Sequence, residues 1–542
     1  MQDIFPDGKI DLSLRIRQPA NKIEALQQKT INLFDRFCED YEEKIRRKGG
    51  IGFFLGGIGP DGHIAFNVRG SSHHSHTRLT QINYETQAAA TVDLGGIEYV
   101  RKKAVITIGL ETITFNPEIT AIIMAAGEAK AKVIADALEQ DPSIEYLASA
   151  LHKIAGARFY LTRGAASKLK ERKKQTIIKE NDNSDKTVHS LIIEGALASG
   201  ISLNEIIDNK IINEKQMHEN FALAEKIASK PIKIIAKDIL RFINDGIEKG
   251  LNLPKNVRIL HTGPHHDDIE LAYFPLLHHL VRSPYNDNHF CYCTSGFTSV
   301  TNTYIEGVLK TLRESIRNGK IFNKYSFQRL SNLLNADDDI TGILHGIAQQ
   351  AQEEQALFVA CRIARKMILH EHIENAEKLL LSVEKHIAIL KTIEPGNREP
   401  EIFQLLKGWL REFEAELVWG HLGINLDHVS HLNLQFYTGD IFVEYPDMQR
   451  DVEPIFNLMD KIRPNIISLA MYPEGSGPDT HMKTLIALAF AIDKYVETYG
   501  CSSIRIWGYR NVWSRFSLTD AGMIVPVSLN SFAVLHNMFP DF

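Results

Sequence analysis

The chain alternates between short apolar runs and longer amphipathic segments. In the first third, the apolar runs are rich in β-branched and aromatic residues and occupy 51–55, 104–108, 121–124 and 157–161. Runs of this length and composition are typical of buried strands, and the helix-like segments between them indicate a parallel βαβ sheet. A charged amphipathic segment from about residue 17 to 48 ends at Gly49-Gly50. Glycine commonly closes a helix, so this segment predicts a helix ahead of the first strand.

A second set of apolar runs begins near Val257. These runs occupy 257–262, 290–293, 466–469 and 523–527. The residues from about 303 to 420 have a helical pattern throughout, and those from about 187 to 250 are also helix-like. The polar stretch Ser167–Lys186 indicates a domain boundary, with a solvated helix end as the alternative.

The pattern as a whole predicts an α/β protein with two Rossmann-like three-layer domains and mostly parallel sheets. We expect the first domain at 1–166, a charged linker and helical connector at 167–250, and the second domain at 251–542. The second domain would carry a long helical insertion at about 303–420. This organisation follows from alternating strand-like and helix-like segments.

Composition narrows the class of protein. The chain has 542 residues, a formal net charge of -6 and 44% hydrophobic residues, which suits a globular protein of two or more domains. No run approaches the roughly 20 apolar residues of a membrane span, and no basic run accompanies aromatic clusters. The first residues lack the pattern of a secretory signal, and the five cysteines are few and scattered. We therefore expect a cytoplasmic protein without nucleic-acid or membrane partners, able to form a homo-oligomer.

The stretch from Gly263 to Glu270 places two imidazoles and two adjacent carboxylates between a predicted strand and a predicted helix. In open α/β sheets, ligands bind beyond the carboxyl ends of the strands. His265 and Asp268 offer the nitrogen and oxygen ligands that zinc accepts, and Asp267 would remain free as a general base. The alternative is a turn whose aspartates only cap the next helix.

This stretch resembles the His-Pro-Asp-Asp turn of the LmbE-like (PIG-L) zinc deacetylases. His265, Asp267 and Asp268 match the turn, and His481 matches the third metal ligand of that family. Further matching segments, in the same order, are 294–296, 411–414, 422–424 and 432–436. The resemblance implies one zinc ion bound by His265, Asp268 and His481, with Asp267 as the catalytic base. One departure is that Pro478 or a close neighbour replaces a second histidine of the family, and proline donates no hydrogen bond.

A second motif, Gly59-Pro-Asp61-Gly-His63, follows the first predicted strand. Asp61 and His63 could exchange protons with a ligand, or they could simply form a tight Asp-Gly turn. Residues 40 to 165 around the motif resemble glucosamine-6-phosphate deaminase, which converts that sugar to fructose 6-phosphate and ammonia. The resemblance implies that Asp61 and His63 assist ring opening and that Lys130 and Arg78 bind the substrate, Lys130 at its phosphate.

The deaminase resemblance has departures that bear on activity. Val68 replaces the glutamate that orients the catalytic histidine, and Val92 replaces a phosphate-binding arginine. The family's phosphate-binding loop and its enolisation aspartate lie upstream of every segment matched here. We therefore expect this first module to be degenerate or truncated and unable to deaminate glucosamine 6-phosphate by itself.

Three functions follow from these observations. The first is a zinc-dependent N-deacetylase of an N-acetylglucosamine-type substrate, free or 6-phosphorylated, fused to an inactive deaminase-like module. The second is an active glucosamine-6-phosphate deaminase. The third is a non-catalytic sensor or scaffold that binds a sugar phosphate. The two enzymatic resemblances describe consecutive reactions, which favours the first.

Overall fold

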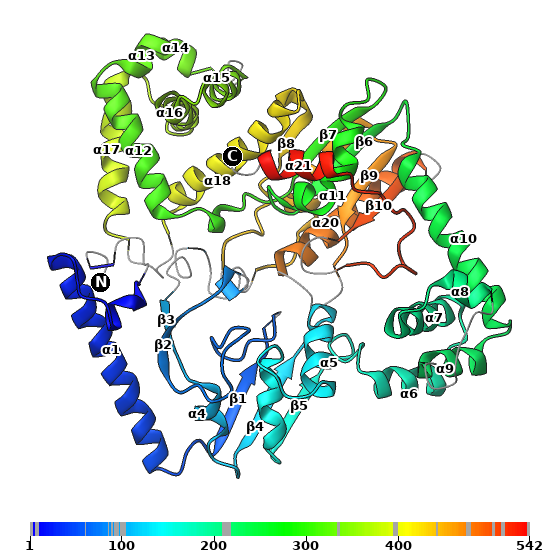
Figure 1. Ribbon diagram of the computed structural model, residues 1–542. Coiled ribbons are helices and arrows are strands. Elements are labelled where there is room, and N and C mark those ends of the chain that lie inside the picture. Colours follow the sequence, from blue (N-terminus) through cyan, green and yellow to red (C-terminus); the bar gives the residue numbers. More distant parts are fainter. Residues whose placement is uncertain are drawn as a thin grey trace.

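The computed structural model is a mixed α/β protein with two parallel sheets, as the apolar pattern predicted (Figure 1). It describes residues 4–5, 10–59, 61–84, 86–87, 90, 97, 104–208, 218–332, 337–393, 399–440, 443–472, 479–500, 504–510 and 515–538.

The first sheet contains three parallel strands in the order β1-β4-β5. The strands are β1 (Phe53–Gly57), β4 (Thr120–Ala125) and β5 (Ala157–Leu161). The apolar run at 104–108 forms β3 (Ala104–Thr107), but it pairs antiparallel with β2 (Arg78–Gln81) in a separate ribbon. Its predicted place in the parallel sheet is therefore wrong, because a short apolar run predicts a strand without specifying its partner.

The two faces of the first sheet differ in burial. One face packs Ala121, Ile123 and Ala125 into a core that α4 (Leu110–Thr114) and α5 (Ala131–Glu139) help to enclose. On the other face, Phe53, Leu55, Met124 and Tyr160 are each more than half exposed. Parallel sheets are usually covered on both faces, so this exposed apolar face departs from the expected three-layer arrangement.

The first helix, α1 (Lys22–Arg47), matches the predicted helix closely. Its amino end is capped by the side chain of Asn21, which accepts a hydrogen bond from the Glu24 backbone N–H. Gly49 and Gly50 both have positive φ and end the helix as predicted.

The stretch at 167–250, predicted as a charged linker and helical connector, is folded into helices. It forms α6 (Lys170–Glu180), α7 (Asp185–Ser199), α8 (Leu203–Ile207), α9 (Glu219–Ile227) and α10 (Ile232–Leu251). These helices share a buried core that includes Leu191, Ile192 and Phe221. The connector is therefore a compact helical unit, and its charged residues lie on the solvated side of the helices.

The second sheet contains five parallel strands in the order β10-β9-β6-β7-β8. The strands are β6 (Arg258–Gly263), β7 (Asp287–Tyr292), β8 (Val429–His431), β9 (Ile466–Ala470) and β10 (Arg505–Tyr509). The helices around them are α11 (Asp268–Leu280), α19 (Glu453–Ile462), α20 (Asp479–Tyr499) and α21 (Leu529–Met538).

The strand-like run at 523–527 is not a strand. Pro526 cannot donate to a strand ladder, and the Ile524 N–H donates to Gly246 O on α10 at 2.9 Å. A Cβ at Gly250 would lie 2.0 Å from Ile524 O, so glycine is required for this close approach. The last strand of the sheet is instead β10, which the sequence pattern did not reveal.

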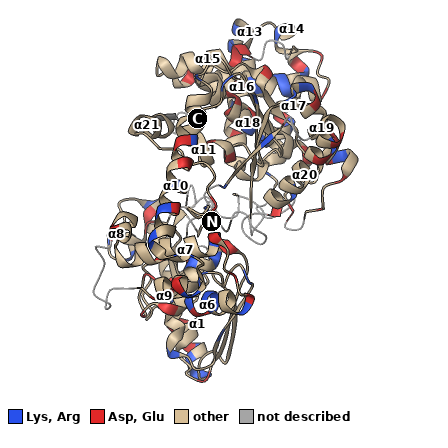
Figure 2. Cartoon of the chain, turned by 90° about the vertical axis from the view of Figure 1, so that its right-hand side faces the viewer, with Lys and Arg blue, Asp and Glu red and all other residues tan. Residues whose placement is uncertain are grey.

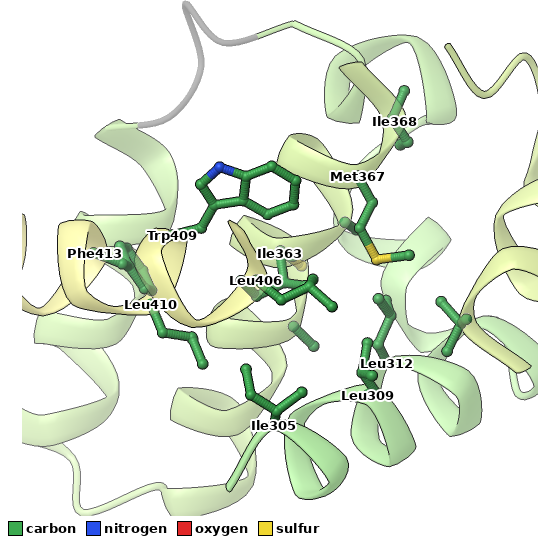
Figure 3. Close-up of a cluster of buried hydrophobic side chains, with 14 of the residues drawn as sticks. Ile305, Leu309, Leu312, Ile363, Met367, Ile368, Leu406, Trp409, Leu410 and Phe413 are labelled. Atoms are coloured by element: carbon green, nitrogen blue, oxygen red, sulfur yellow. The ribbon is translucent and has the colours of Figure 1, made fainter. Parts of the chain in front are cut away.

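The helical insertion predicted at about 303–420 is present. It comprises α12 (Asn302–Arg317), α13 (Lys320–Lys324), α14 (Phe327–Leu330), α15 (Asp337–Ala348), α16 (Gln352–His370), α17 (Ala376–Leu390) and α18 (Glu401–His421). Figure 3 shows side chains of its buried core, among them Leu309, Met367 and Trp409. Arg365 and Asp339, both fully buried, form an ion pair at 2.6 Å that ties α16 to α15.

Short helical turns complete the chain. They are the 3-10 turns η2 (Leu12–Arg15), η3 (Glu128–Lys130), η4 (Leu147–Lys153), η6 (Phe297–Ser299) and η8 (Leu426–His428), and the π-helical turn η9 (Met448–Val452). Figure 2 shows acidic and basic residues interspersed along the helices. Among the described helices, none has the length and apolar character needed to cross a membrane.

Candidate functional site

The order of the second sheet defines one crevice for a ligand. From β6 the chain proceeds to β7 and β8 on one side, and it then returns to β9 and β10 on the other. The direction of winding therefore reverses between β6 and β9, and ligands of open α/β sheets bind beyond the carboxyl ends of strands at such a point. His265 and Asp268 follow β6, and His481 lies on α20, the helix after β9.

The structure brings His265, Asp268 and His481 together. His265 Nδ1 lies 2.8 Å from His481 Nε2 and 3.5 Å from Asp268 Oδ2. His481 Nε2 lies 3.4 Å from the same Asp268 oxygen. The His265 backbone N–H also donates to Asp268 Oδ2 at 2.9 Å, which fixes the carboxylate within the turn. Two ring nitrogens and one carboxylate oxygen therefore converge from segments more than 200 residues apart in sequence.

Burial sets the charges of this cluster. Asp268 and His481 are buried, whereas the side chain of His265 is 18% exposed. Burial lowers the pKa of His481 to about 4, so its ring is neutral at pH 7. Burial would raise the pKa of Asp268, but His481 and His265 outweigh it and hold that pKa well below its usual range. A neutral imidazole and an ionised carboxylate are the forms that bind a metal.

The donor set fits zinc. A tetrahedral zinc ion with bonds of about 2.0–2.1 Å separates its ligand atoms by about 3.3 Å. The two distances to Asp268 Oδ2, 3.5 and 3.4 Å, are close to that separation. The two ring nitrogens are 2.8 Å apart, so they would need to separate only slightly to bind one ion. Three protein ligands with one partly exposed side correspond to an open site rather than a closed structural one.

Asp267, the predicted general base, lies at the mouth of this cluster. Its side chain is 48% exposed, and its Oδ1 lies 3.7 Å from Arg411 Nη2. Arg411 comes from α18 of the helical insertion and also binds Glu414 at 2.7 Å. In the sequence, Arg411 belongs to a segment that matches the LmbE-like family, but no pattern indicates a role for it. The sequence does not show that α18 reaches the site.

Gly296 lies beside the cluster. Its φ is +60°, in the left-handed region that favours glycine. A Cβ at this position would lie 3.4 Å from His266 Nδ1 and 3.7 Å from Arg411 Nε. The loop after β7 therefore lies directly against the residues of the site.

A buried polar layer supports the cluster from behind. His266 lies where the His-Pro-Asp-Asp turn has proline, and its Nε2 lies 3.2 Å from His431 Nδ1 at the end of β8. The His266 ring also stacks on Tyr292, with ring centroids 4.9 Å apart. Tyr292 donates to the buried carboxyl of Glu270 and accepts from Trp419 Nε1 at 2.7 Å. The doublet His265-His266 therefore divides into one residue facing the site and one packed beneath it.

In the first domain, Asp61 and His63 form a close pair after β1. His63 Nδ1 lies 2.5 Å from Asp61 Oδ1, and Asn83 Nδ2 donates to Asp61 Oδ2 at 3.2 Å. Burial would raise the pKa of Asp61, but its contacts with His63 lower it to about 2, so it is ionised at pH 7. Val68 offers His63 no hydrogen bond, and the carboxylate that contacts His63 here is Asp61.

Gly59 makes the pair possible. A Cβ at Gly59 would lie 2.0 Å from His63 Cε1, so the imidazole occupies the space of a side chain. A cavity of about 390 Å³ adjoins Asp61. Its basic lining residues are already engaged: Arg69 binds Glu145 at 3.0 Å and Lys132 binds Asp136 at 2.9 Å.

The two predicted substrate-binding residues of this domain lie on different elements. Lys130 ends η3, after β4, and is half-buried at the same sheet edge as Asp61. Arg78 begins β2 and donates to the side chain of buried Asn67 at 2.9 Å, so it holds the loop that follows His63. Val92 and Pro478, which marked departures from the two families, lie outside the described residues.

Comparison with known proteins identifies relatives of one kind. No protein-family model matches the chain. The chain is 26% identical over 510 residues to a "glucosamine-6-phosphate deaminase-like protein" of Bacteroides thetaiotaomicron, which covers 91% of this chain and 67% of that protein. It is 37% identical over 148 residues to glucosamine-6-phosphate deaminase of Borreliella afzelii, covering 27% of this chain and 54% of that enzyme.

Two further matches were found. The glucosamine-6-phosphate deaminase of Caenorhabditis elegans is 40% identical over 137 residues, covering 25% of this chain and 50% of the enzyme. A solved monomeric glucosamine-6-phosphate deaminase is 34% identical over 24% of this chain and 54% of its own, with a TM-score of 0.23. The chain spans about half the length of the deaminases it matches. None of these matches supports the LmbE-like resemblance. The chain therefore contains a glucosamine-6-phosphate deaminase-like domain.

Proposed function

We propose that this protein acts in amino-sugar metabolism as a zinc-dependent N-deacetylase of an N-acetylglucosamine-type substrate. The observation that carries the proposal is the convergence of His265, Asp268 and His481 where the winding of the second sheet reverses. This place and this donor set are those of an open hydrolytic metal site.

The identity of the relatives supports an amino-sugar substrate. The deaminases that match the chain are named for glucosamine 6-phosphate. Hydrolysis of the acetamide of N-acetylglucosamine 6-phosphate yields acetate and that same sugar phosphate. A deacetylase joined to a deaminase-like domain would therefore combine two modules that recognise related sugars.

The residues around the cluster suit amide hydrolysis. Bound zinc would act as a Lewis acid that polarises the acyl oxygen and favours deprotonation of water. Asp267 would accept the proton from the attacking water and return it to the leaving nitrogen. Arg411, 3.7 Å away, holds the Asp267 carboxylate at the mouth of the site. His265 and His481 would hold the metal through their ring nitrogens and take no part in proton transfer.

The test is acetate release from N-acetylglucosamine 6-phosphate and from N-acetylglucosamine, measured on zinc-reconstituted protein. We expect about one zinc equivalent to be lost in His265→Ala and in His481→Ala, together with activity. Asp267→Asn should retain that zinc but lose most activity, because the amide cannot accept the proton. Asp61→Asn is the matched control and should release acetate as the parent does.

Each outcome decides between the functions. Full zinc content in both histidine variants would refute the ligand assignment. An Asp267→Asn protein as active as the parent would refute the role of the base. Zinc binding without acetate release from either substrate would favour a non-catalytic sugar-binding protein.

A second candidate activity is deamination, favoured by the Asp61–His63 pair at 2.5 Å. The two basic residues that line the cavity beside that pair, Arg69 and Lys132, each bind a carboxylate, Glu145 and Asp136. Val68 and Val92 replace the glutamate and the arginine that the deaminase resemblance implies. We therefore propose that this chain alone forms no fructose 6-phosphate or ammonia from glucosamine 6-phosphate. Turnover that disappears in Asp61→Asn would show the opposite.

A further inference from the structure

A second cluster of metal-binding side chains lies at the other end of the second sheet. It consists of Asp287 and His289 on β7 and His428 in η8, immediately before β8. Asp287 is the first residue of its strand, so this cluster lies at the amino ends of the strands. The cluster described above follows their carboxyl ends. The two groups share no residue.

The strand register builds this second cluster. β7 and β8 are parallel, with Phe290 opposite Val429, so the preceding residues, His289 and His428, are also neighbours. Their rings stack with centroids 4.5 Å apart and planes at 28°. Asp287 lies two residues before His289 and therefore on the same face of β7.

The ligand atoms already face one another. Asp287 Oδ1 lies 3.2 Å from His289 Nε2 and 3.7 Å from His428 Nδ1. The nearby cation Arg258 is directed elsewhere, because its Nη1 donates to Ile462 O at 2.8 Å. Within the described part of the chain, the ion pairs of Asp287 are those with these two histidines.

We propose that Asp287, His289 and His428 form a second binding site for a divalent transition metal of the zinc class. Two imidazoles and one carboxylate are ligands that zinc accepts, and the two separations from Asp287 Oδ1, 3.2 and 3.7 Å, are close to the roughly 3.3 Å between ligands of a tetrahedral ion. His289 is 16% exposed, whereas His428 and Asp287 are 37% and 44% exposed. A metal can therefore enter from solvent and retain water at its remaining positions.

A metal here would link the edge of the sheet to its interior. β8 is the edge strand and has three residues, from Val429 to His431. Bound metal would fasten its amino end to β7 through His428. The other end of the strand carries His431, which lies 3.2 Å from His266 in the layer beneath the first cluster. The second site would thus stabilise the strand that supports the first.

The experiment isolates this site from the proposed deacetylase centre. The full chain carrying His265→Ala and His481→Ala is stripped with a chelator and titrated with zinc by calorimetry. We expect one remaining equivalent, and a rise in melting temperature on zinc addition. Adding Asp287→Asn, which preserves side-chain shape, should weaken binding at least tenfold, and adding His289→Ala should abolish it. His345→Ala, an exposed histidine of α15, is the control and should change neither.

The results separate the two sites. If the double variant binds no zinc, or if its zinc persists after both Asp287→Asn and His289→Ala, the second site does not exist. Circular dichroism of each variant distinguishes lost binding from lost folding, and Asp287→Asn is the decisive variant if His289→Ala does not fold. Failure of acetate release in the parent protein would leave this result unaffected.

Discussion

Glu270→Gln offers a sharp test of the buried layer beneath the candidate site. The Glu270 carboxyl is buried, accepts a hydrogen bond from Tyr292, and has an Oε2 with no hydrogen-bond partner. Burial raises its pKa from 4.5 to about 8, so it is protonated at pH 7. Glutamine keeps the shape and the oxygen that accepts from Tyr292. It also leaves one polar group unpaired, as the protonated acid does.

The sign of the effect follows from the raised pKa. Below pH 4.5 the carboxyl is protonated in the folded and unfolded chains, and it does not change stability with pH. From pH 4.5 to about 8 the Glu270 carboxyl ionises only in the unfolded chain. The free energy of unfolding therefore falls by about 1.4 kcal/mol for each pH unit. The loss reaches about 5 kcal/mol above pH 8. Glutamine does not ionise and removes this loss.

The assay is urea unfolding of metal-free protein at pH 5.5 and 8.5, followed by tryptophan fluorescence. Trp419 reports directly, because it donates to Tyr292 in the same layer. The stability advantage of Glu270→Gln over the parent should grow by about 3 to 4 kcal/mol between these pH values. Glu248→Gln, an exposed control on α10, should show no such growth. An equal difference at both pH values would refute the buried, protonated state of Glu270.

Two further substitutions test the packing on which the sites depend. Asp339→Ala leaves the fully buried guanidinium of Arg365 without its carboxylate partner. In urea titrations it should lower the free energy of unfolding by about 3 to 5 kcal/mol. A change below about 1 kcal/mol would contradict the burial of the pair. Gly59→Ala places a methyl 2.0 Å from His63 Cε1, so the His63 ring resonance should shift in NMR spectra as its contact with Asp61 breaks. Gly52→Ala meets nothing within 4 Å and should leave that resonance in place.

The sequence predicted elements well where a periodic pattern was long. The sequence predicts α1 and the helical character of the insertion, because amphipathic repeats over many residues specify a helix without reference to partners. The strand predictions were wrong where they depended on which strand is the pairing partner. β3 pairs with β2 rather than entering the parallel sheet. The pattern does not reveal β10, and it predicts a strand around Pro526 where the structure has none.

The candidate site could be predicted only in part for a similar reason. His265 and Asp268 are neighbours in one turn. His481 is distant in sequence, and only the family resemblance assigns it to the same site. No pattern revealed that Arg411, carried by a distant helix, contacts Asp267. Nor did any pattern show that Asp61 would itself be the partner of His63, since the sequence places them two residues apart without fixing the turn.

The position of α18 has a consequence for how the second domain unfolds. One side of this helix carries Trp409 and Phe413 into the core of the insertion, whereas Ala415 and Trp419 further along pack with Phe290 in the sheet domain. A helix that belongs to two cores cannot open without exposing both. The insertion and the sheet should therefore behave as one cooperative unit in hydrogen exchange, with the amides of α18 protected to the limit of global unfolding. Excising 303–420 as a removable module would take away part of the hydrophobic core of the sheet domain as well as Arg411.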